Sequence, residues 1–409
     1  MAAAPTPAAV ADALQRAAAR YGTPAYVYDL DRVGVQIGRL RCALPPGVQV
    51  RYSVKANPAP AVCQAIAGAG VGAEVSSAGE LAVALDAGFR PARILVSGPY
   101  KEPGLLRQLA ALPEALISVD SVSELAALAR SPGGARQVLL RLRPDYPIPG
   151  DMPAGPSSRF GIPLAELAAA AGHVGRTVTC AGFHVHGGSQ ILDPVQAARQ
   201  LSDACALAAR AAALLGVVPA VLNLGGGFGV PYAAGDTEFD VAKAAAALRS
   251  PPAELPSATV TLALGRYLVA DAGWYLTRVV HTQTFGGNPA VVVDGGIHHR
   301  PDLCGLDLAR RGRPPLLLGP QRSGTTPTAV LGCLCLPWDI LAHAAALPAL
   351  HPGDVLAFPA AGAYGLTAAP AGFLGHPVPA EIALAGGALT LLPPLQLLHS
   401  QAPVPAGLP

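Results

Sequence analysis

Between about residues 26 and 265, short β-rich runs alternate with Ala- and Leu-rich stretches of helical length, and this alternation constrains the fold most strongly. The runs that read as strands are 25–28, 48–54, 94–97, 116–119, 138–142, 177–186 and 220–224. Helix-like stretches between them include 59–69, 79–87, 104–111, 123–130 and 194–215. Repeated strand–helix units with short connections are typical of a parallel sheet, open or closed. About eight units in about 240 residues favour a closed (β/α)8 TIM-like barrel over residues 26–265.

The pattern of the sequence changes after Arg266. Val-rich runs, Gly-Gly and Pro-Pro turns and few long helical stretches predict a separate β domain over residues 266–409. Residues 1–25 are expected to pack on that β domain. The predicted fold class is therefore α/β, a TIM-like barrel followed by a C-terminal β domain.

Charge and composition exclude several classes of partner. The net charge is +2 without a basic run, so neither nucleic acid nor an anionic membrane surface is expected to bind. The most apolar late window, residues 329–350, contains Asp339, His343 and two prolines, which argues against a membrane span. No secretory signal is evident at the N-terminus. Seven scattered cysteines form no disulfide framework, so a reduced cytoplasm is the expected location.

Lysine is rare in this chain. Only three of the 28 basic Lys and Arg residues are lysines, namely Lys55, Lys101 and Lys243. Lys55 lies in Tyr52-Ser-Val-Lys-Ala-Asn57 at the end of a predicted strand, where barrels gather catalytic groups. Partial desolvation there would favour the neutral amine, which can form an imine as arginine cannot. The structural alternative is a lysine that extends into solvent from a strand end.

Two glycine-containing segments follow later predicted strands. Gly225-Gly-Gly-Phe-Gly229 would let backbone N–H groups approach a phosphate, but it lacks the spacing and the acidic residue of the dinucleotide fingerprint. In His184-Val-His-Gly-Gly-Ser189, alternation places both histidines on one face. That pair could bind a metal, stack over a flat cofactor or serve the fold alone. Cys333-Leu-Cys335 has no second pair at zinc spacing, so no metal site is expected.

Taken in order, and with Gly265-Arg-Tyr267 and Gly362-Ala-Tyr364, these segments resemble the alanine-racemase-like (fold-type III) decarboxylases that use pyridoxal 5′-phosphate (PLP). This group includes the diaminopimelate, ornithine and arginine decarboxylases. The resemblance runs from Thr23–Asp29 to Pro379–Glu381. It implies a barrel joined to a β domain, and a homodimer whose head-to-tail subunits share active sites at their interface.

The resemblance also implies roles for individual residues. Lys55 would hold PLP, and His186 would lie over its pyridine ring. The residues that match the family's phosphate ligands are Ser189, Gly225, Gly226, Gly227, Arg266 and Tyr364. Cys335 matches a cysteine that the partner subunit contributes and that reprotonates the substrate carbon. A thiol near a phosphate is a plausible acid for that step.

The residue after the matched cysteine departs from the family pattern. Diaminopimelate and ornithine decarboxylases have Glu or Asp there to receive the distal amine of the substrate, and this chain has Leu336. Leucine cannot offset the desolvation of an ammonium group, so diaminopimelate, ornithine and lysine are disfavoured as substrates. The Leu-Pro-Trp-Asp segment is closer to the branch of natural-product and siderophore pathways, where amino acid substrates can be acylated or carrier-tethered.

Other departures concern the cofactor ring. Ala263 stands where a Glu usually contacts the pyridine nitrogen, and Arg159 stands where Lys is common. Glu74 replaces a shorter Asp near the same ring, and its extra length could let it reach the nitrogen. The alternative is that Glu74 only caps the following turn.

The resulting prediction is a PLP-dependent decarboxylase of an amino acid or amino-acid derivative in a specialised biosynthetic pathway. An amino-acid racemase of the same fold is one alternative, although no segment matches the tyrosine base that it would need. A non-catalytic, PLP-binding regulatory homologue is another. The loss of Glu at Ala263 favours that reading, whereas the presence of Lys55, Cys335 and the phosphate ligands opposes it.

Overall fold

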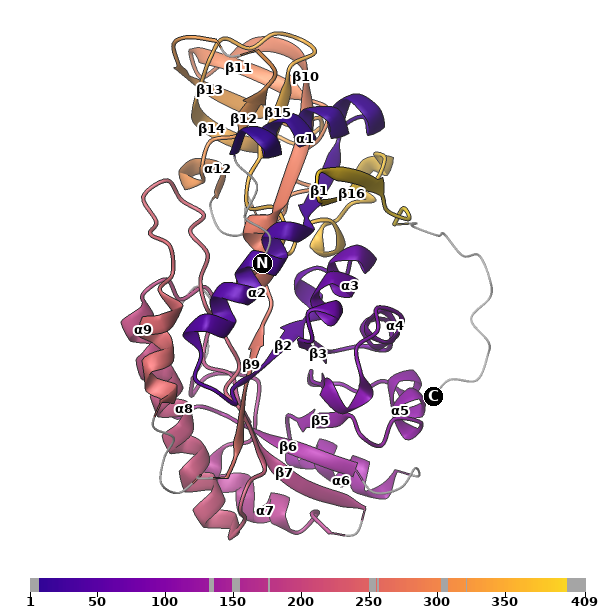
Figure 1. Cartoon of the computed structure of the whole chain (residues 1–409), viewed down its shortest axis with the longest axis vertical. Helices are drawn as coiled ribbons and strands as arrows, with labels where there is room; N and C mark the ends of the chain where they lie inside the picture. Colours follow the sequence, from indigo (N-terminus) through magenta and orange to yellow (C-terminus); the bar gives the residue numbers. More distant parts are fainter. Residues whose placement is uncertain are drawn as a thin grey trace.

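The computed structural model describes residues 7–131, 136–148, 155–175, 177–249, 255, 257–302, 308–320 and 322–395. Eight parallel strands, β2 to β9, close into a barrel, which confirms the predicted TIM-like fold (Figure 1). Their bounds are β2 Gln49–Ser53, β3 Gly72–Val75, β4 Ile94–Val96, β5 Leu116–Val119, β6 Arg136–Leu142, β7 Val178–Val185, β8 Val221–Asn223 and β9 Thr259–Leu264. The sequence analysis missed β3 and β9, and β9 closes the barrel by pairing with β2.

Helices surround the barrel and bury their apolar faces against it. They are α2 Leu30–Ala43, α3 Pro60–Gly68, α4 Ala78–Asp86, α5 Pro103–Ala110, α6 Val122–Arg130, α7 Leu167–Ala171, α8 Pro194–Leu215, α9 Val241–Ala245 and α10 Arg266–Val269. Short 3₁₀ turns are η1 Val54–Ala56, η2 Pro91–Arg93, η3 Leu164–Glu166, η4 Ala246–Leu248, η5 Ala270–Ala272, η6 Leu366–Ala368 and η7 Phe373–Gly375. Local sequence sets the helix starts: the Ser77 and Ser121 hydroxyls each accept the backbone N–H three residues on at 3.1 Å, as N-caps do.

A second sheet of nine strands forms the other part of the molecule, which confirms the predicted C-terminal β region (Figure 1). Its main order is β14-β13-β11-β10-β1-β16-β17, and β15 pairs with both β10 and β12. The bounds are β1 Ala25–Asp29, β10 Gly273–Phe285, β11 Asn288–Val293, β12 Leu316–Leu318, β13 Thr326–Leu331, β14 Ile340–Leu347, β15 Val355–Phe358, β16 Ala380–Ala385 and β17 Ala388–Leu391. Among the described residues, the other helices are α1 Pro7–Tyr21 and α12 Leu308–Arg311.

The strand expected at 25–28 does not belong to the barrel, and this corrects the sequence analysis. β1 lies in the second sheet, where Tyr26 is opposite Tyr275 of β10 and Glu381 of β16. All five of its residues are buried, as expected of a central strand covered on both faces. The barrel is already closed by the β2–β9 pair, so no free edge remains there for β1.

Helix α1 packs on the second sheet through small and apolar side chains. Leu14 and Ala17 are fully buried in one cluster with Val27 of β1 and Leu276 of β10.

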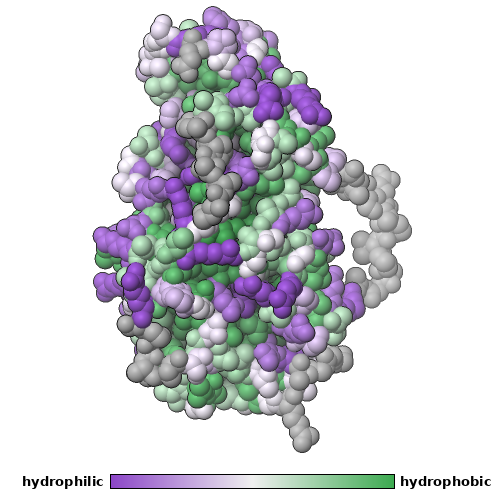
Figure 2. Space-filling view, viewed as in Figure 1, coloured by the Kyte–Doolittle hydropathy of each residue, from purple (hydrophilic) through white to green (hydrophobic). Residues whose placement is uncertain are grey.

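The division into domains at residues 26–265 and 266–409 remains a proposal. On the face seen in Figure 2, hydrophobic and hydrophilic side chains are interspersed over both parts of the molecule. Within the described residues, no helix is long and apolar enough to cross a membrane.

Candidate active site

The turn that carries Lys55 is held by the other residues of its motif. β2 ends at Ser53, and the 3₁₀ turn η1, which contains Lys55, follows directly. The Tyr52 hydroxyl donates to the Asn57 carbonyl oxygen at 2.8 Å, and the Asn57 side-chain amide donates to the Gly362 carbonyl oxygen at 2.9 Å. Tyr52 and Asn57 are both buried, whereas Lys55 is the one exposed residue of the six. Within a single chain Lys55 is therefore an exposed residue, and the partial desolvation of its amine stays a prediction.

The three lysines occupy different environments. The Lys101 Nζ atom is buried, lies 2.7 Å from a Glu124 carboxylate oxygen and also donates to two backbone carbonyls. Lys243 is exposed on the outer helix α9. Lys55 makes no hydrogen bond or ion pair with the described residues, and it follows a barrel strand at its carboxyl end. Only Lys55 among the three thus combines a free amine with a position at the barrel mouth.

Glu74 lies beside the Lys55 turn inside the barrel mouth. It is the register partner of Ser53, whose hydroxyl donates to a Glu74 carboxylate oxygen at 2.9 Å. Burial alone would raise the pKa of Glu74, but its electrostatic interactions with His184 and Lys55 and hydrogen bonds from the Ser97 and Ser53 side chains more than offset this and lower it. Glu74 is therefore an anion at neutral pH. Glu74 is not the cap of the following turn, because the Glu80 carboxylate accepts the backbone N–H of Ser76 there.

The two histidines that end β7 have different partners. His184 is 2% exposed, and its Nδ1 lies 2.8 Å from the Ser118 hydroxyl, which fixes the ring inside the barrel. His186 is only partly buried, and burial together with Arg141 and Lys55 lowers its pKa to about 4. A neutral imidazole at the mouth can lie against a flat aromatic ring without bringing a second cation beside Lys55.

The triple glycine packs too closely against its neighbours for any side chain. Gly225 and Gly227 have φ angles of 64° and 85°, which L-residues rarely adopt. A Cβ atom on Gly226 would lie 2.2 Å from the Ala263 carbonyl oxygen, and one on Gly227 would lie 2.4 Å from the Gly188 carbonyl oxygen. The glycine loop therefore packs closely against β9 and against the segment that carries Ser189. This places the triple glycine and Ser189, which are both predicted phosphate ligands, in neighbouring segments.

Arg266 provides the clearest sign of an anion site. It donates to the Tyr232 hydroxyl at 3.0 Å, and its guanidinium carbon lies 4.7 Å from the centre of the Tyr364 ring. Its Nε–H is buried and has no hydrogen-bond partner among the described residues. A buried, charged donor without a partner is costly, and an anionic oxygen would satisfy it. The residues thus fit a phosphate group. Sequence reasoning missed Tyr232, since an isolated tyrosine gives no motif.

Cys335 and Leu336 lie between β13 and β14, outside the barrel. Cys335 is exposed and Leu336 is partly buried. Neither forms a hydrogen bond or ion pair with the residues of the barrel mouth described above. Within one chain, the structure therefore brings together the lysine, the glutamate, the histidines and the phosphate residues, but not the predicted acid.

These features define a barrel enzyme with a free lysine and an anion site at the carboxyl ends of its strands, suited to a phosphorylated cofactor that carries a carbonyl group. Residues 30–270 match the pyridoxal-binding domain of the pyridoxal-dependent decarboxylases. The L-glutamyl-[BtrI acyl-carrier protein] decarboxylase of Niallia circulans is 32% identical over 91% of each chain. The diaminopimelate decarboxylase of Deinococcus radiodurans is 34% identical over 91% of this chain and 93% of its own.

A solved structure agrees with these relatives. The diaminopimelate decarboxylase of Helicobacter pylori, crystallised with L-lysine, superposes with a TM-score of 0.82 at 25% identity, over 92% of this chain and 95% of that one. The chain belongs to the pyridoxal-dependent decarboxylase family. It is a PLP-dependent carboxy-lyase, and the predicted cofactor and reaction type are confirmed.

Proposed function

We propose that Lys55 holds PLP and that Arg266, Tyr364, Ser189 and the triple glycine 225–227 bind its phosphate. The observation that carries this proposal is the buried Arg266 Nε–H without a partner, close to the Tyr364 ring. When bound, PLP delocalises the electron pair that remains on the substrate carbon after CO₂ leaves. The protein has to orient the carboxylate, anchor the cofactor and deliver a proton.

Glu74 and His186 hold the cofactor ring in this proposal. Glu74 serves as the anionic partner of the pyridine nitrogen, in place of the Glu that Ala263 replaces. Its lowered pKa supports this, because a carboxylate that stays ionised can keep a nearby nitrogen protonated. His186 lies against the ring face as a neutral imidazole.

Cys335 of the partner subunit delivers the proton to the substrate carbon. Support for a shared site comes from two side chains that are both exposed in a single chain, Lys55 at the barrel mouth and Cys335 beyond β13. In a two-fold dimer an interface residue of each subunit can enter the site of the other. The proposed enzyme is thus a homodimer with two shared sites. We propose a cytoplasmic location for it, which the seven scattered cysteines of the sequence support.

The substrate is an amino acid or amino-acid derivative whose distal group is neutral or acylated, free or tethered to a carrier protein. Leu336 follows Cys335 and gives the distal part of this site an apolar side chain that offers no counter-charge to an ammonium group. The relative from Niallia circulans, which by its name acts on a carrier-bound glutamyl group, supports the tethered form.

The test is a screen for CO₂ release by the PLP-loaded protein. The panel contains free, acylated and carrier-tethered amino acids, and chiral analysis of recovered substrate detects racemisation. Release from an acylated or tethered substrate, lost in Lys55→Ala, is the expected result. A protein that binds PLP but releases CO₂ from no member of the panel would favour the regulatory reading, and inversion without CO₂ release would favour the racemase.

A further inference from the structure

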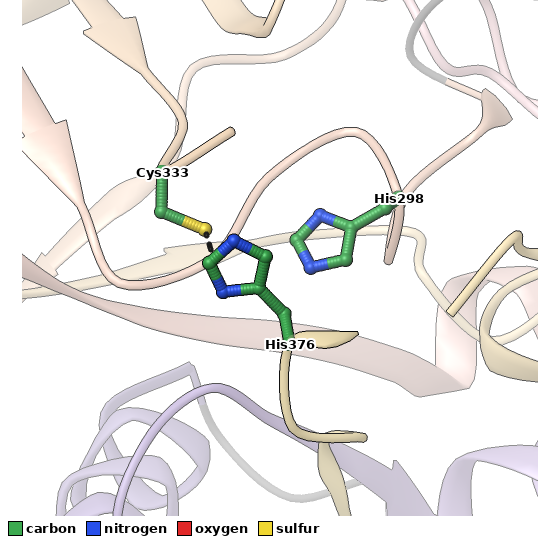
Figure 3. Close-up of side chains that lie close together, drawn as sticks. All are labelled: His298, Cys333 and His376. Atoms are coloured by element: carbon green, nitrogen blue, oxygen red, sulfur yellow. Dashed lines mark hydrogen bonds between the residues drawn. The ribbon is translucent and has the colours of Figure 1, made fainter. Parts of the chain in front are cut away.

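A second cluster of chemically capable side chains lies in the nine-stranded sheet part of the molecule, outside the cofactor site. It consists of His298 from the turn after β11, Cys333 from the turn after β13 and His376 from the segment before β16 (Figure 3). The three side chains point toward one another, and each offers one ligand atom within 4.8 Å of the other two. The Cys333 Sγ and His376 Nδ1 atoms are 3.9 Å apart.

These separations suit a small metal ion. In a tetrahedral zinc site, with Zn–N of about 2.0–2.1 Å and Zn–S of about 2.3 Å, ligand atoms lie roughly 3.4–3.6 Å apart. From separations of up to 4.8 Å, the ligand atoms therefore need to move closer by at most about 1.4 Å. Two imidazoles and a thiol are the donors that zinc prefers, whereas Mg²⁺ and Ca²⁺ prefer oxygen.

His298 independently indicates that a ligand is needed. The residue is 1% exposed, and neither of its ring nitrogens has a hydrogen-bond partner among the described residues. The adjacent His299 differs, because its Nδ1 lies 3.0 Å from the Tyr275 hydroxyl. A buried imidazole with both nitrogens unpaired is costly, and coordination of a metal by one of them would remove part of that cost.

The backbone around the cluster is held in place by one carboxylate. Asp339 accepts the backbone N–H of Ile297 at 2.8 Å and that of Leu334 at 2.7 Å, and these residues adjoin His298 and Cys333. Gly332 permits this close approach, since a Cβ there would lie 2.1 Å from an Asp339 carboxylate oxygen. Two of the three ligands are thus positioned before any metal binds, which is the arrangement expected of a built site.

We propose that His298, Cys333 and His376 form a zinc site, with water at the fourth position. The site ties together three segments that are far apart in the sequence. One of them, Gly332–Asp339, also carries Cys335 and Leu336. Zinc binding goes beyond the proposed decarboxylation and does not depend on it.

The experiment measures the metal content of the tag-free, PLP-loaded protein after growth with added zinc, by inductively coupled plasma mass spectrometry. We expect about one zinc per chain in the wild type and loss of zinc in Cys333→Ser and His376→Asn. The matched controls are Cys335→Ser, a thiol two residues away, and His281→Asn, an exposed histidine on β10. Both should keep the metal. Circular dichroism verifies that each variant is folded.

Cobalt substitution of the wild type keeps the proposal testable if a variant does not fold. Tetrahedral Co²⁺ gives visible d–d bands, and competition with zinc should abolish them. Thermal unfolding with and without a chelator should show a lower Tm for the metal-free wild type. Copper in place of zinc, zinc retained in the folded Cys333→Ser/His376→Asn double variant, or folded wild type that takes up no metal from excess zinc would each overturn the proposal.

Discussion

The backbone N–H of Tyr364 donates to the Ala56 carbonyl oxygen at 2.7 Å, so a C-terminal segment is bonded to the residue next to Lys55. Tyr364 has a φ angle of 53°, an unusual backbone conformation for a tyrosine. The Asn57 side-chain amide, which donates to the Gly362 carbonyl oxygen, adds a second bond between the same two segments. The proposed lysine and one proposed phosphate ligand are therefore fixed relative to each other, although about 310 residues separate them.

Shared active sites predict complementation between two inactive variants. Lys55→Ala lacks the proposed cofactor lysine, and Cys335→Ala lacks the proposed acid. When the two are mixed and allowed to exchange subunits, half of the dimers are mixed, and each mixed dimer has one intact site. Activity should return to about a quarter of the wild-type value. Activity that stays absent after native mass spectrometry has shown mixed dimers would contradict sites shared between subunits.

Substrate choice should follow Leu336. We expect weak turnover of diaminopimelate, ornithine and lysine, because their distal ammonium group would be desolvated beside a leucine. Leu336→Glu should raise kcat/KM for these amines roughly tenfold or more, the effect of one hydrogen bond to a charged group. Leu336→Met, which keeps a neutral side chain of similar size, is the control. Efficient decarboxylation of free meso-diaminopimelate by the wild type would refute this account of specificity.

Glu74 should matter for kcat more than for cofactor binding. With Ala263 in place of the usual Glu, Glu74→Gln leaves no carboxylate for the ring nitrogen, so we expect kcat at saturating PLP to fall on the order of tenfold or more. Ala263→Glu in the same variant should recover part of the loss. Glu114→Gln, an exposed glutamate, is the control. An unchanged kcat in Glu74→Gln would exclude Glu74 as the compensating acid.

His186 predicts a specific dependence of stability on pH in PLP-free protein. Burial, Arg141 and Lys55 lower its pKa to about 4, whereas an exposed imidazole titrates near about 6.5. As the pH falls from 7 toward 4, the unfolded chain therefore binds a proton at this residue before the folded chain does, and the free energy of unfolding decreases. Between pH 7 and 5 the wild type should lose about 1–2 kcal/mol more than His186→Gln.

Urea unfolding at the two pH values measures this difference. His281→Gln, which changes an exposed histidine, should behave as the wild type does. Equal losses in the wild type and His186→Gln would mean that the buried ring already accepts a proton near neutral pH.

Periodicity predicted the barrel because most of its strands are short apolar runs between Ala-rich helices. It missed β3, which is only four residues long and begins with glycine. It assigned β1 to the barrel, because strand propensity alone does not say which sheet a strand will join. The pairing of β1 with β10 and β16 depends on contacts with residues 273 to 385, and no local pattern reports such contacts.

The candidate site followed from the sequence where its residues form motifs, as in Tyr52–Asn57, His184–Ser189 and Gly225–Gly229. The unpaired Arg266 Nε–H and its Tyr232 partner became visible only when burial was known. The Cys333-Leu-Cys335 segment predicted no metal site, because no second pair at zinc spacing follows it, yet in the structure Cys333 lies close to His298 and His376. Ligands from three separate segments leave no spacing for sequence analysis to detect.

The most direct test of the central claim is to map the attachment of PLP. Borohydride reduction of the PLP-loaded protein, digestion and mass spectrometry should place the pyridoxyl group on Lys55, at about one per chain. Lys55→Ala and Lys55→Arg should lose it, whereas Lys243→Ala, on the outer helix α9, should keep it. A pyridoxyl group on Lys101 or Lys243, or a normal amount of reduced adduct in Lys55→Ala, would contradict the assignment of Lys55 as the cofactor lysine.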